Sequence, residues 1–292
     1  MNPPFLALIF FLSIVQLSAQ ITHPRASPFS VVEQEVGLSK IRVEYSRPAV
    51  KGRHVFGPQD DGQKGLVPHN RIWRVGANES TKVIIDSDAL VMGNALAKGI
   101  YALYAFPEES EWQIAFHTNT THWGDGRKKY NPEEDAFRIK VQPQTIPYHQ
   151  ENFLISFDSL THNSAHLNLI WASTKVSIPI SFDTEAQMKA EIAKQLKENP
   201  TAQTYYEAAR YLQEQDKDVN RALDYLNKAL DLGGDTYYFH RVKSLVQAKL
   251  GDYKEAIVSA QKSLEIDASL EKDEFVLMNE KNIKKWKAKL KE

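Results

Sequence analysis

The sequence contains no cysteine among its 292 residues, and this absence removes several kinds of chemistry at once. Without thiols the chain can form no disulfide, no thiolate zinc site and no cysteine nucleophile, and it offers no cysteine for a lipid anchor. An excess of charge is also missing, since 36 Lys and Arg residues face 37 Asp and Glu residues and leave a net charge of −1. Binding to a phosphate backbone requires a basic excess, so we expect no nucleic-acid partner.

Sequence signatures of common enzymes are missing as well. The chain has no Gly-x-Ser-x-Gly nucleophile motif, no phosphate-binding loop, no His-Glu-x-x-His zinc motif and no dinucleotide-binding fingerprint. We therefore expect no cofactor and no metal ion, and we favour a non-catalytic role over an enzymatic one.

Long hydrophobic runs are absent except at the N-terminus. Residues 5–17 form an apolar run that is shorter than the roughly 20 residues needed to span a bilayer, and Ser18-Ala19 follows it. This pattern is typical of a secretory signal peptide, so we interpret residues 1–19 as one that is cleaved after Ala19. The sequence thus predicts an exported protein, periplasmic or extracellular, with no integral membrane span in the mature chain. An uncleaved N-terminal anchor is the alternative.

The first half of the chain alternates between apolar and polar residues. The clearest alternating runs are Ile41/Val43/Tyr45, Val83/Ile85, Trp112/Ile114/Phe116, Phe137/Ile139/Val141, Phe153/Ile155/Phe157, Leu167/Leu169/Trp171 and Val176/Ile178/Ile180/Phe182. A period of two buries one face of a sheet and leaves the other in water, so these runs predict half-buried strands. Many strands without helices between them predict an antiparallel β-sandwich over residues 27–182, with a closed barrel as the alternative.

After residue 183 the period changes to about 3.6, which predicts an all-α domain over residues 184–292. A shift of 34 residues aligns Ala222 with Ala256 and Leu230 with Leu264. The segment 250–264 resembles the second half of a tetratricopeptide repeat, which implies tetratricopeptide-like helical hairpins. About three repeats are usually needed to bury their own faces, so we expect the flanking helices to act as caps. The whole chain is therefore predicted to be α+β in two segregated domains.

One segment, from Tyr45 to Thr81, departs from the alternation. It is rich in Gly and Pro, which fix turns, and between residues 47 and 74 it carries six positive residues against only Asp60 and Asp61. A rigid loop with Arg forks, an indole and an Asn/Glu pair is suited to an anionic or sugar-like ligand. The candidate ligand-binding residues are Tyr45, Arg47, Arg53, Trp73, Arg74, Asn78 and Glu79. The alternative is a structural loop whose side chains pair within the fold.

The same segment carries a family resemblance. The strings YSRP, KGR followed by FG, LVP and WRVGANE resemble a secreted family, common in Bacteroidetes, that is known as domain of unknown function 2911. Similar motifs continue at residues 97–104, at Trp123-Gly124 and at residues 171–179, so the resemblance covers roughly residues 27–181. It departs from the family pattern at Val75, where Thr is expected, and in an expanded loop at residues 60–64. The resemblance implies export and an all-β domain, but it assigns no activity and no catalytic residue.

The histidines give two pairs to consider as metal ligands. His117 and His122 flank a polar turn, and His162 and His166 lie four residues apart in a stretch that does not read as helical. At both pairs we favour neutral surface histidines.

Two other features have a simple interpretation each. The acidic run Glu133-Glu134-Asp135 is interpreted as a charged turn that precedes the strand at Phe137. Trp123 is either an aromatic contact for a sugar or a residue that caps the sandwich, and we favour the cap.

Three functions remain open. The favoured one is an exported, non-catalytic module whose β domain binds a small molecule or glycan and whose helical repeats bind a protein or peptide. The second is a hydrolase acting on an extracellular, anionic polymer, with the arginines steering the substrate and Glu79 as acid or base. The third is a structural role without a partner. A ligand site requires the candidate side chains to converge on one open cavity, and a hydrolase also requires a second carboxylate facing Glu79.

Overall fold

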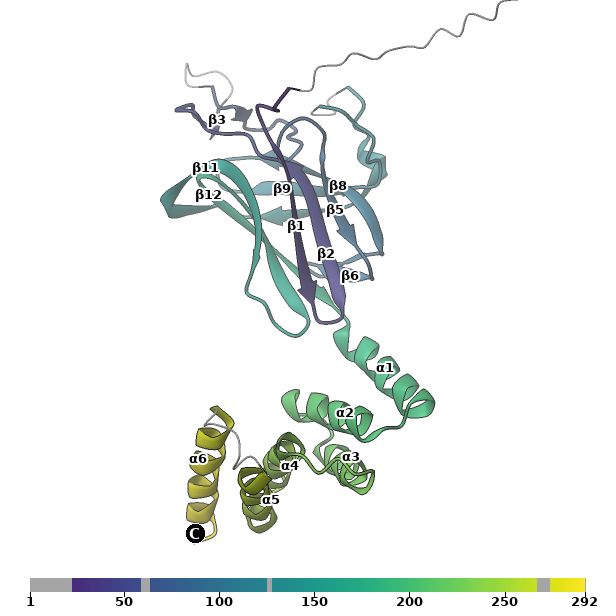
Figure 1. Ribbon diagram of the computed structural model, residues 1–292. Coiled ribbons are helices and arrows are strands. Elements are labelled where there is room, and N and C mark those ends of the chain that lie inside the picture. The colour runs from purple at the N-terminus through teal and green to yellow at the C-terminus, as the bar shows by residue number, and fades with distance from the viewer. Residues whose placement is uncertain (1–22, 59–63, 125–127, 267–273, 292) are drawn as a thin grey trace, which may run out of the picture. The chain divides into compact units, whose positions relative to one another are not determined.

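The computed structural model describes residues 23–58, 64–124, 128–266 and 274–291. The predicted signal peptide, residues 1–19, lies outside the described residues, and so do Asp60 and Asp61. The chain divides between Phe182 and Asp183 into two compact units. The described part of the first unit is built from strands and one short 3₁₀ turn, and that of the second from helices (Figure 1). The predicted α+β organisation, with segregated β and α parts, is confirmed.

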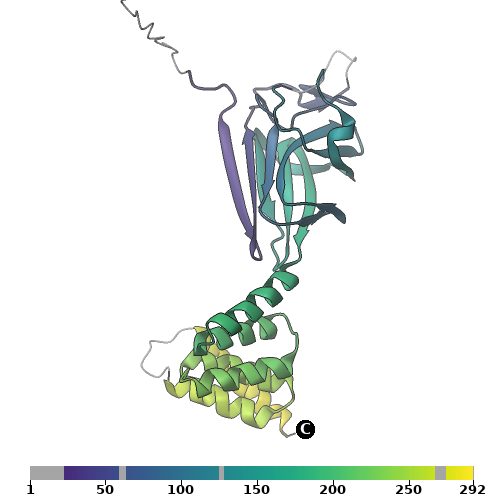
Figure 2. The same cartoon turned by 90° about the vertical axis from the view of Figure 1, so that its right-hand side faces the viewer.

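Two antiparallel sheets form the β unit, and they appear as two layers in Figures 1 and 2. The six-stranded sheet has the order β1 (Phe29–Val36), β2 (Ser39–Ser46), β5 (Thr81–Ile85), β8 (Gly99–Pro107), β9 (Trp112–His117) and β10 (Asp135–Val141). The four-stranded sheet has the order β11 (Gln144–Asp158), β12 (Ser164–Phe182), β6 (Ala89–Val91) and β7 (Asn94–Leu96). A short parallel pair, β3 (Phe56–Gly57) and β4 (Val67–Pro68), lies within the Gly- and Pro-rich segment.

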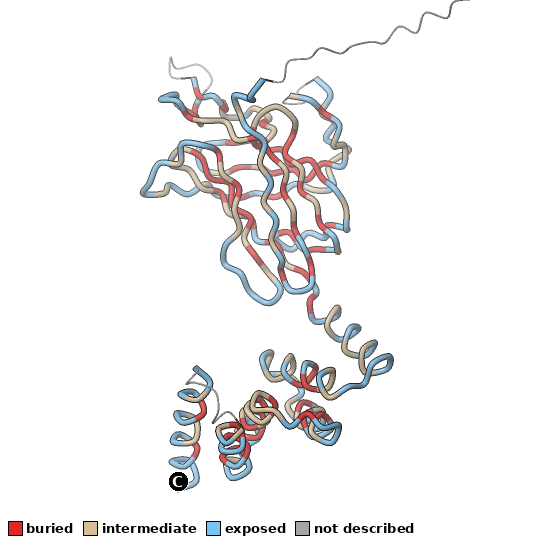
Figure 3. The backbone as a smooth tube through the Cα atoms, viewed as in Figure 1, coloured by how far each residue is buried: buried red, intermediate tan, exposed pale blue. Residues whose placement is uncertain are grey.

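The alternating apolar residues of the strands share one core between the sheets. In β2, Ile41 and Val43 are fully buried, whereas the intervening Arg42 and Glu44 are partly exposed and form an ion pair at 3.1 Å. The same core includes buried residues of β11 and β12, and Figure 3 shows buried residues along the strands of both sheets. Removal of this apolar surface from water stabilises the fold by about 25 cal/mol for each Å² buried.

Two central strands are buried on both faces over most of their length. Residues 101–105 of β8 and residues 114–117 of β9 are all buried. Their outer faces carry a second, smaller apolar cluster, in which Tyr104 packs against Ile72 and Tyr130. Ile72 belongs to the Gly- and Pro-rich segment, and Tyr130 to the segment between β9 and β10. The prediction of a face in water is therefore wrong for β9, because these two loop segments cover that face, and they cover the same face of β8.

An aromatic cluster joins the two sheets at one end of the core. It consists of Phe56 (β3), Trp73, Trp112 (β9), Phe153 (β11) and Trp171 (β12), whose neighbouring rings have centroids 4.7 to 6.1 Å apart. Trp73 stacks on Trp171 at 5.9 Å with an interplanar angle of 16°. Its backbone also pairs with Ala105 of β8, because each residue donates its N–H to the other's carbonyl, at 2.8 and 2.9 Å. The Gly- and Pro-rich segment is thereby fixed to both sheets.

The second unit contains six helices among the described residues: α1 (Thr184–Glu198), α2 (Ala202–Glu214), α3 (Val219–Asp231), α4 (Tyr237–Lys249), α5 (Tyr253–Ile266) and α6 (Glu274–Lys289). Several of these helices begin at a residue whose side chain caps the N-terminus. Asp183 accepts a hydrogen bond from the backbone N–H of Ala186, and Thr201 accepts one from that of Thr204. None of the helices in the described ranges is long and apolar enough to cross a membrane.

Small residues allow the helices to pack closely. Ala222 of α3 and Ala256 and Ala260 of α5 are fully buried, and α5 begins 34 residues after α3. Ala256 and Ala260 share an apolar cluster with Trp286 of α6. A larger side chain at these positions has no space unless the helices move apart.

We expect Ala260→Leu to lower the free energy of unfolding of the helical unit by about 1–3 kcal/mol, because the added methylenes overpack a filled interface. Gln261→Leu, which places the same side chain on the exposed position next to it, should change this free energy by less than about 0.5 kcal/mol. Urea unfolding followed by circular dichroism at 222 nm measures both variants. Equal effects of the two substitutions would show that Ala260 does not lie in a filled interface between helices.

Candidate functional site

Two of the predicted ligand-binding residues make hydrogen bonds to the backbone of β11. Tyr45 is buried, packs edge-on against Phe153, and its hydroxyl accepts a hydrogen bond from the N–H of Ile155 at 3.1 Å. Arg47 donates from Nε to the carbonyl of Phe153 at 2.9 Å. Both side chains therefore connect the Gly- and Pro-rich segment to β11 instead of facing a ligand.

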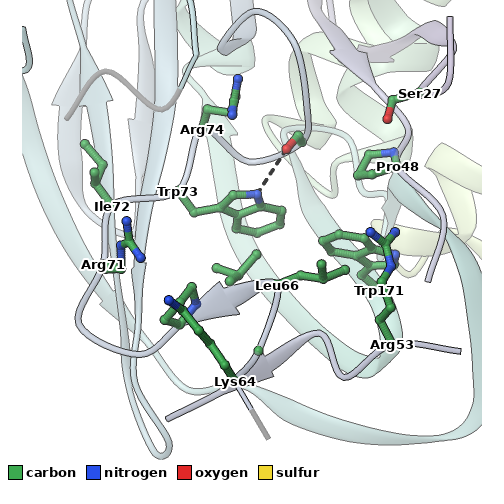
Figure 4. A pocket seen from close by; sticks show the side chains of 14 residues that line it. Ser27, Pro48, Arg53, Lys64, Leu66, Arg71, Ile72, Trp73, Arg74 and Trp171 are labelled. Atoms are coloured by element: carbon green, nitrogen blue, oxygen red, sulfur yellow. Dashed lines mark hydrogen bonds between the residues drawn. The ribbon is translucent and has the colours of Figure 1, made fainter. Parts of the chain in front are cut away.

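Trp73 organises the tight turn that follows it. Its Nε1–H donates to the carbonyl of Gly76 at 3.1 Å (Figure 4). Gly76 has a φ of +142°, and a Cβ at this position would lie 2.9 Å from the carbonyl oxygen of Ser46. Only glycine fits both the conformation and the close approach, which gives a physical reason for the Gly in the WRVGANE string.

The residues after this turn are also paired within the fold. The Asn78 side chain donates to the carbonyl of Ser27 and to the hydroxyl of Ser46, both at 3.1 Å. Glu79 forms an ion pair with Arg25 at 3.3 Å. Asn78 and Glu79 thus connect this turn to the chain that leads into β1.

A cavity of about 360 Å³ opens beside the Trp73 turn. Its floor includes Trp73 and Trp171, and Leu66, which is 39% exposed, lies over them (Figure 4). The residues that line it are Ser27, Pro48, Arg53, Lys64, Gly65, Leu66, Val67, Pro68, Arg71, Ile72, Trp73, Arg74, Gly76 and Trp171. The cavity is within the range of small-molecule sites, which measure roughly 300–1,000 Å³.

Four cationic side chains line this cavity, and the described lining residues include no carboxylate. Arg53 donates to the carbonyls of Ala49 and Val50 at 2.7 and 2.9 Å, and Arg74 donates to the carbonyl of Asn78 at 2.6 Å. A carbonyl orients a guanidinium group without neutralising its charge. Lys64 and Arg71 have no hydrogen bond or ion pair among the described residues. The cavity therefore carries positive charge that the described lining does not compensate.

The predicted site residues converge only in part. Arg53, Trp73 and Arg74 line the cavity, whereas Tyr45, Arg47, Asn78 and Glu79 do not. Sequence reasoning did not select Lys64 and Arg71, although both belong to the basic run that drew attention to the segment. Trp171 was missed because it lies about a hundred residues further along the chain, and no local pattern connects it to Trp73.

The hydrolase alternative requires two carboxylates across a cleft. Glu79 does not line this cavity and pairs with Arg25, and the described lining residues include no carboxylate. Nothing in the described geometry therefore favours an acid–base pair at this place.

A second polar cluster lies on the outer face of the six-stranded sheet. His117, at the end of β9, is fully buried, and His122 is 7% exposed. Their rings lie 5.5 Å apart, and both face Glu134, which belongs to a 3₁₀ turn before β10. The expectation of surface histidines is wrong for this pair, because the segment between β9 and β10 folds back over the sheet. Of the other pair, His162 is exposed and His166 is half-buried.

The polar groups of this cluster are held in place by their neighbours. His117 Nδ1 lies 2.9 Å from Oδ1 of Asp135, whose carboxylate also accepts from Tyr130 and Arg138, each at 2.7 Å. Burial, with the Asp135 carboxylate adding to it, raises the pKa of Tyr130 well above its ordinary value. Burial, and secondarily the proximity of His117, lowers the pKa of His122, so that its imidazole stays neutral near pH 7. The predicted charged turn at residues 133–135 is thus a turn whose last two carboxylates face His117.

Trp123 does not cap the sandwich, since it is 70% exposed. The N–H of the next residue, Gly124, donates to the same Asn78 carbonyl that accepts from Arg74. Trp123 therefore presents an indole to solvent from a segment that is fixed beside Arg74, and the favoured prediction of a cap is wrong.

Comparison with protein families gives a match for the β unit. A family model described as "Protein of unknown function (DUF2911)" matches residues 27–180, which is more than half of the chain and nearly all of the β unit. A search of curated proteins gives no match.

We expect Trp73→Phe to lower the free energy of unfolding of the β unit by about 2–3 kcal/mol. The substitution leaves a cavity between the sheets and removes the donor to the Gly76 carbonyl. Trp123→Phe makes the same chemical change at an exposed indole and should be nearly neutral. Differential scanning calorimetry compares the two variants, and equal losses would show that Trp73 is not part of the core.

Proposed function

Given that the chain belongs to the DUF2911 family, a family of proteins of unknown function, we propose its function from the geometry of the β unit. The protein is a non-catalytic binding module whose β-sandwich binds a small anionic organic ligand in the cavity beside Trp73. A carboxylated or phosphorylated sugar unit is the ligand class that matches this cavity.

The observation that carries the proposal is the positive charge around the cavity, which no carboxylate among the described lining residues compensates. Arg53 and Arg74 are oriented by backbone carbonyls and keep free N–H donors, while Lys64 and Arg71 have no partner among the described residues. Guanidinium and ammonium groups that converge on one concave surface bind carboxylate or phosphate through charge-assisted hydrogen bonds. The cost of orienting the arginines is met during folding and not during binding, which favours affinity.

The remaining walls define the size and the non-ionic part of the ligand. About 360 Å³ accommodates a molecule of the size of one sugar unit with its anionic group. Leu66, Trp73 and Trp171 provide an apolar floor against which the carbon skeleton of such a ligand packs.

Export and source are part of the proposal. The apolar run at residues 5–17 supports a signal peptide and therefore a periplasmic or extracellular location. The family resemblance of the sequence motifs supports a Bacteroidetes source. Anionic sugar units are abundant in extracellular polymers, so the location agrees with the ligand class.

The helical unit supports a second candidate function, the binding of a protein or peptide. We assign α2–α3 and α4–α5 to tetratricopeptide-like hairpins on the basis of the 34-residue spacing and the buried Ala222 and Ala256. A cavity of about 310 Å³ among α1, α2 and α3 exposes Ile192, Tyr211 and Tyr225 between charged residues. Selection from a random peptide library tests this function. Enriched peptides should lose binding to Tyr211→Ala, and a selection without enrichment contradicts it.

A calorimetric titration with glucuronate, glucose 6-phosphate and neutral glucose tests the main proposal. We expect at least one of the two anions to bind and glucose to bind at least about tenfold more weakly. Arg71→Gln should weaken binding of the anion about tenfold or more, since a hydrogen bond to a charged group contributes about 1.5–3 kcal/mol. Lys64→Gln should weaken it in the same direction.

Lys51→Gln is the matched control. Lys51 lies on an exposed turn of the same segment, outside the residues that line the cavity, and its substitution removes the same charge. Binding should be unchanged in this variant. Three results would overturn the proposal. They are equal binding of glucose and the anions, anion binding that neither Arg71→Gln nor Lys64→Gln alters, and failure of both anions to bind.

A further inference from the structure

Two buried atoms on the outer face of the six-stranded sheet face each other without a hydrogen bond. They are Nε2 of His117 and Oε2 of Glu134, which lie 3.2 Å apart but not in hydrogen-bond geometry. Neither atom has another hydrogen-bond partner. Leaving a buried polar atom unpaired costs about 1–3 kcal/mol, and more for a charged group, so this arrangement requires an explanation.

The neighbours of His117 determine which of its nitrogens carries a proton. Nδ1 lies 2.9 Å from Asp135 Oδ1, and this carboxylate is an acceptor that Tyr130 and Arg138 also bind. In the neutral imidazole, Nδ1 is therefore the protonated nitrogen, and Nε2 presents its lone pair toward Glu134. A lone pair that faces a carboxylate oxygen is repulsive unless a proton or a metal ion lies between them.

A third donor completes the group. His122 is buried beside His117, and its Nδ1 lies 3.2 Å from the hydroxyl of Tyr104, which orients the ring. One ligand atom from each of His117, His122 and Glu134 lies within 4.8 Å of the other two. Donor atoms around a tetrahedral zinc ion are about 3.4 Å apart, since the bonds measure about 2.0–2.2 Å. Small side-chain rotations therefore bring the three atoms onto one ion.

We propose that His117, His122 and Glu134 form a binding site for a divalent transition-metal ion. Two imidazoles and one carboxylate suit zinc, and the same donors accept other first-row ions of the series. The three protein ligands leave a coordination position for water. Asp135 acts on the ion through His117, because its hydrogen bond to Nδ1 fixes the ring and increases the basicity of Nε2.

The ion has a structural consequence for the loop that supplies its ligands. His117 ends β9, whereas His122 and Glu134 belong to the segment that leads to β10 and covers β8 and β9. An ion that binds all three side chains links this covering segment to the sheet. Because it binds the folded state selectively, it also raises the stability of the β unit.

Titration of tag-free, chelator-treated protein with zinc chloride in a calorimeter tests the proposal. We expect one ion per chain and a rise in the temperature of unfolding. Cobalt chloride should give visible absorption bands that report imidazole and carboxylate ligands. Glu134→Gln and His122→Gln should each weaken zinc binding by more than about 100-fold, since even outer-shell changes cost about 10- to 100-fold.

Glu151→Gln is the matched control. Glu151 also lies beside a histidine, the exposed His149 at 3.1 Å, but this pair is not part of a group of three possible ligands among the described residues. Its zinc affinity should equal that of the unchanged protein. Circular dichroism checks that each variant folds. If Glu134→Gln does not fold, the zinc affinity of His122→Gln decides the outcome. Absence of stoichiometric zinc binding, or affinity that survives in the folded variants of Glu134 and His122, would show that the cluster is a polar network without an ion.

Discussion

The aromatic cluster between the two sheets is the constraint on which the rest of the β unit depends. Phe56 and Trp73 enter from the Gly- and Pro-rich segment and pack against Trp112, Phe153 and Trp171 of the strands. Aromatic pairs of this kind contribute about 0.5–1.5 kcal/mol each beyond their buried area. The segment is thus part of the core and not a free loop, and its charged side chains emerge from a fixed backbone.

The two candidate sites have one structural feature in common, because at both of them a loop folds back on the sandwich. Beside Trp73 the loop orients Arg53 and Arg74 with neutral backbone carbonyls, so these hydrogen bonds position the positive charge without removing it. On the outer face of β8 and β9 the second loop buries the His117 ring and one carboxylate oxygen of Glu134, and the two facing atoms are unpaired. Stability alone favours polar groups that are paired with one another. Polar or charged groups that the fold holds in place without such a partner therefore point to a ligand.

The sequence predicts the parts of the fold that depend on local periodicity. Alternation located β2, β5 and β9 to β12, and the change of period near residue 183 located the helices, whereas no alternating run marked β1, β3, β4 or β6 to β8. The site was less predictable because it depends on contacts between distant residues. The alternation at Trp112, Ile114 and Phe116 correctly placed these residues inward, but it gave no reason to expect a buried His117, because a period of two contains no information about a loop that covers the opposite face. Similarly, no local signal pairs Trp171 with Trp73.

Native-state hydrogen exchange of the Trp73 and Ala105 amides tests most directly whether the basic segment is a rigid part of the core. These two N–H groups donate to each other's carbonyls, and the Val67 amide donates to the carbonyl of Val55 within the segment. The account predicts that the Trp73, Ala105 and Val67 amides exchange only through global unfolding of the β unit, at the rate of the central strands. Exchange of Trp73 and Val67 near the rate of an unstructured chain, while β2 and β5 remain protected, would contradict it.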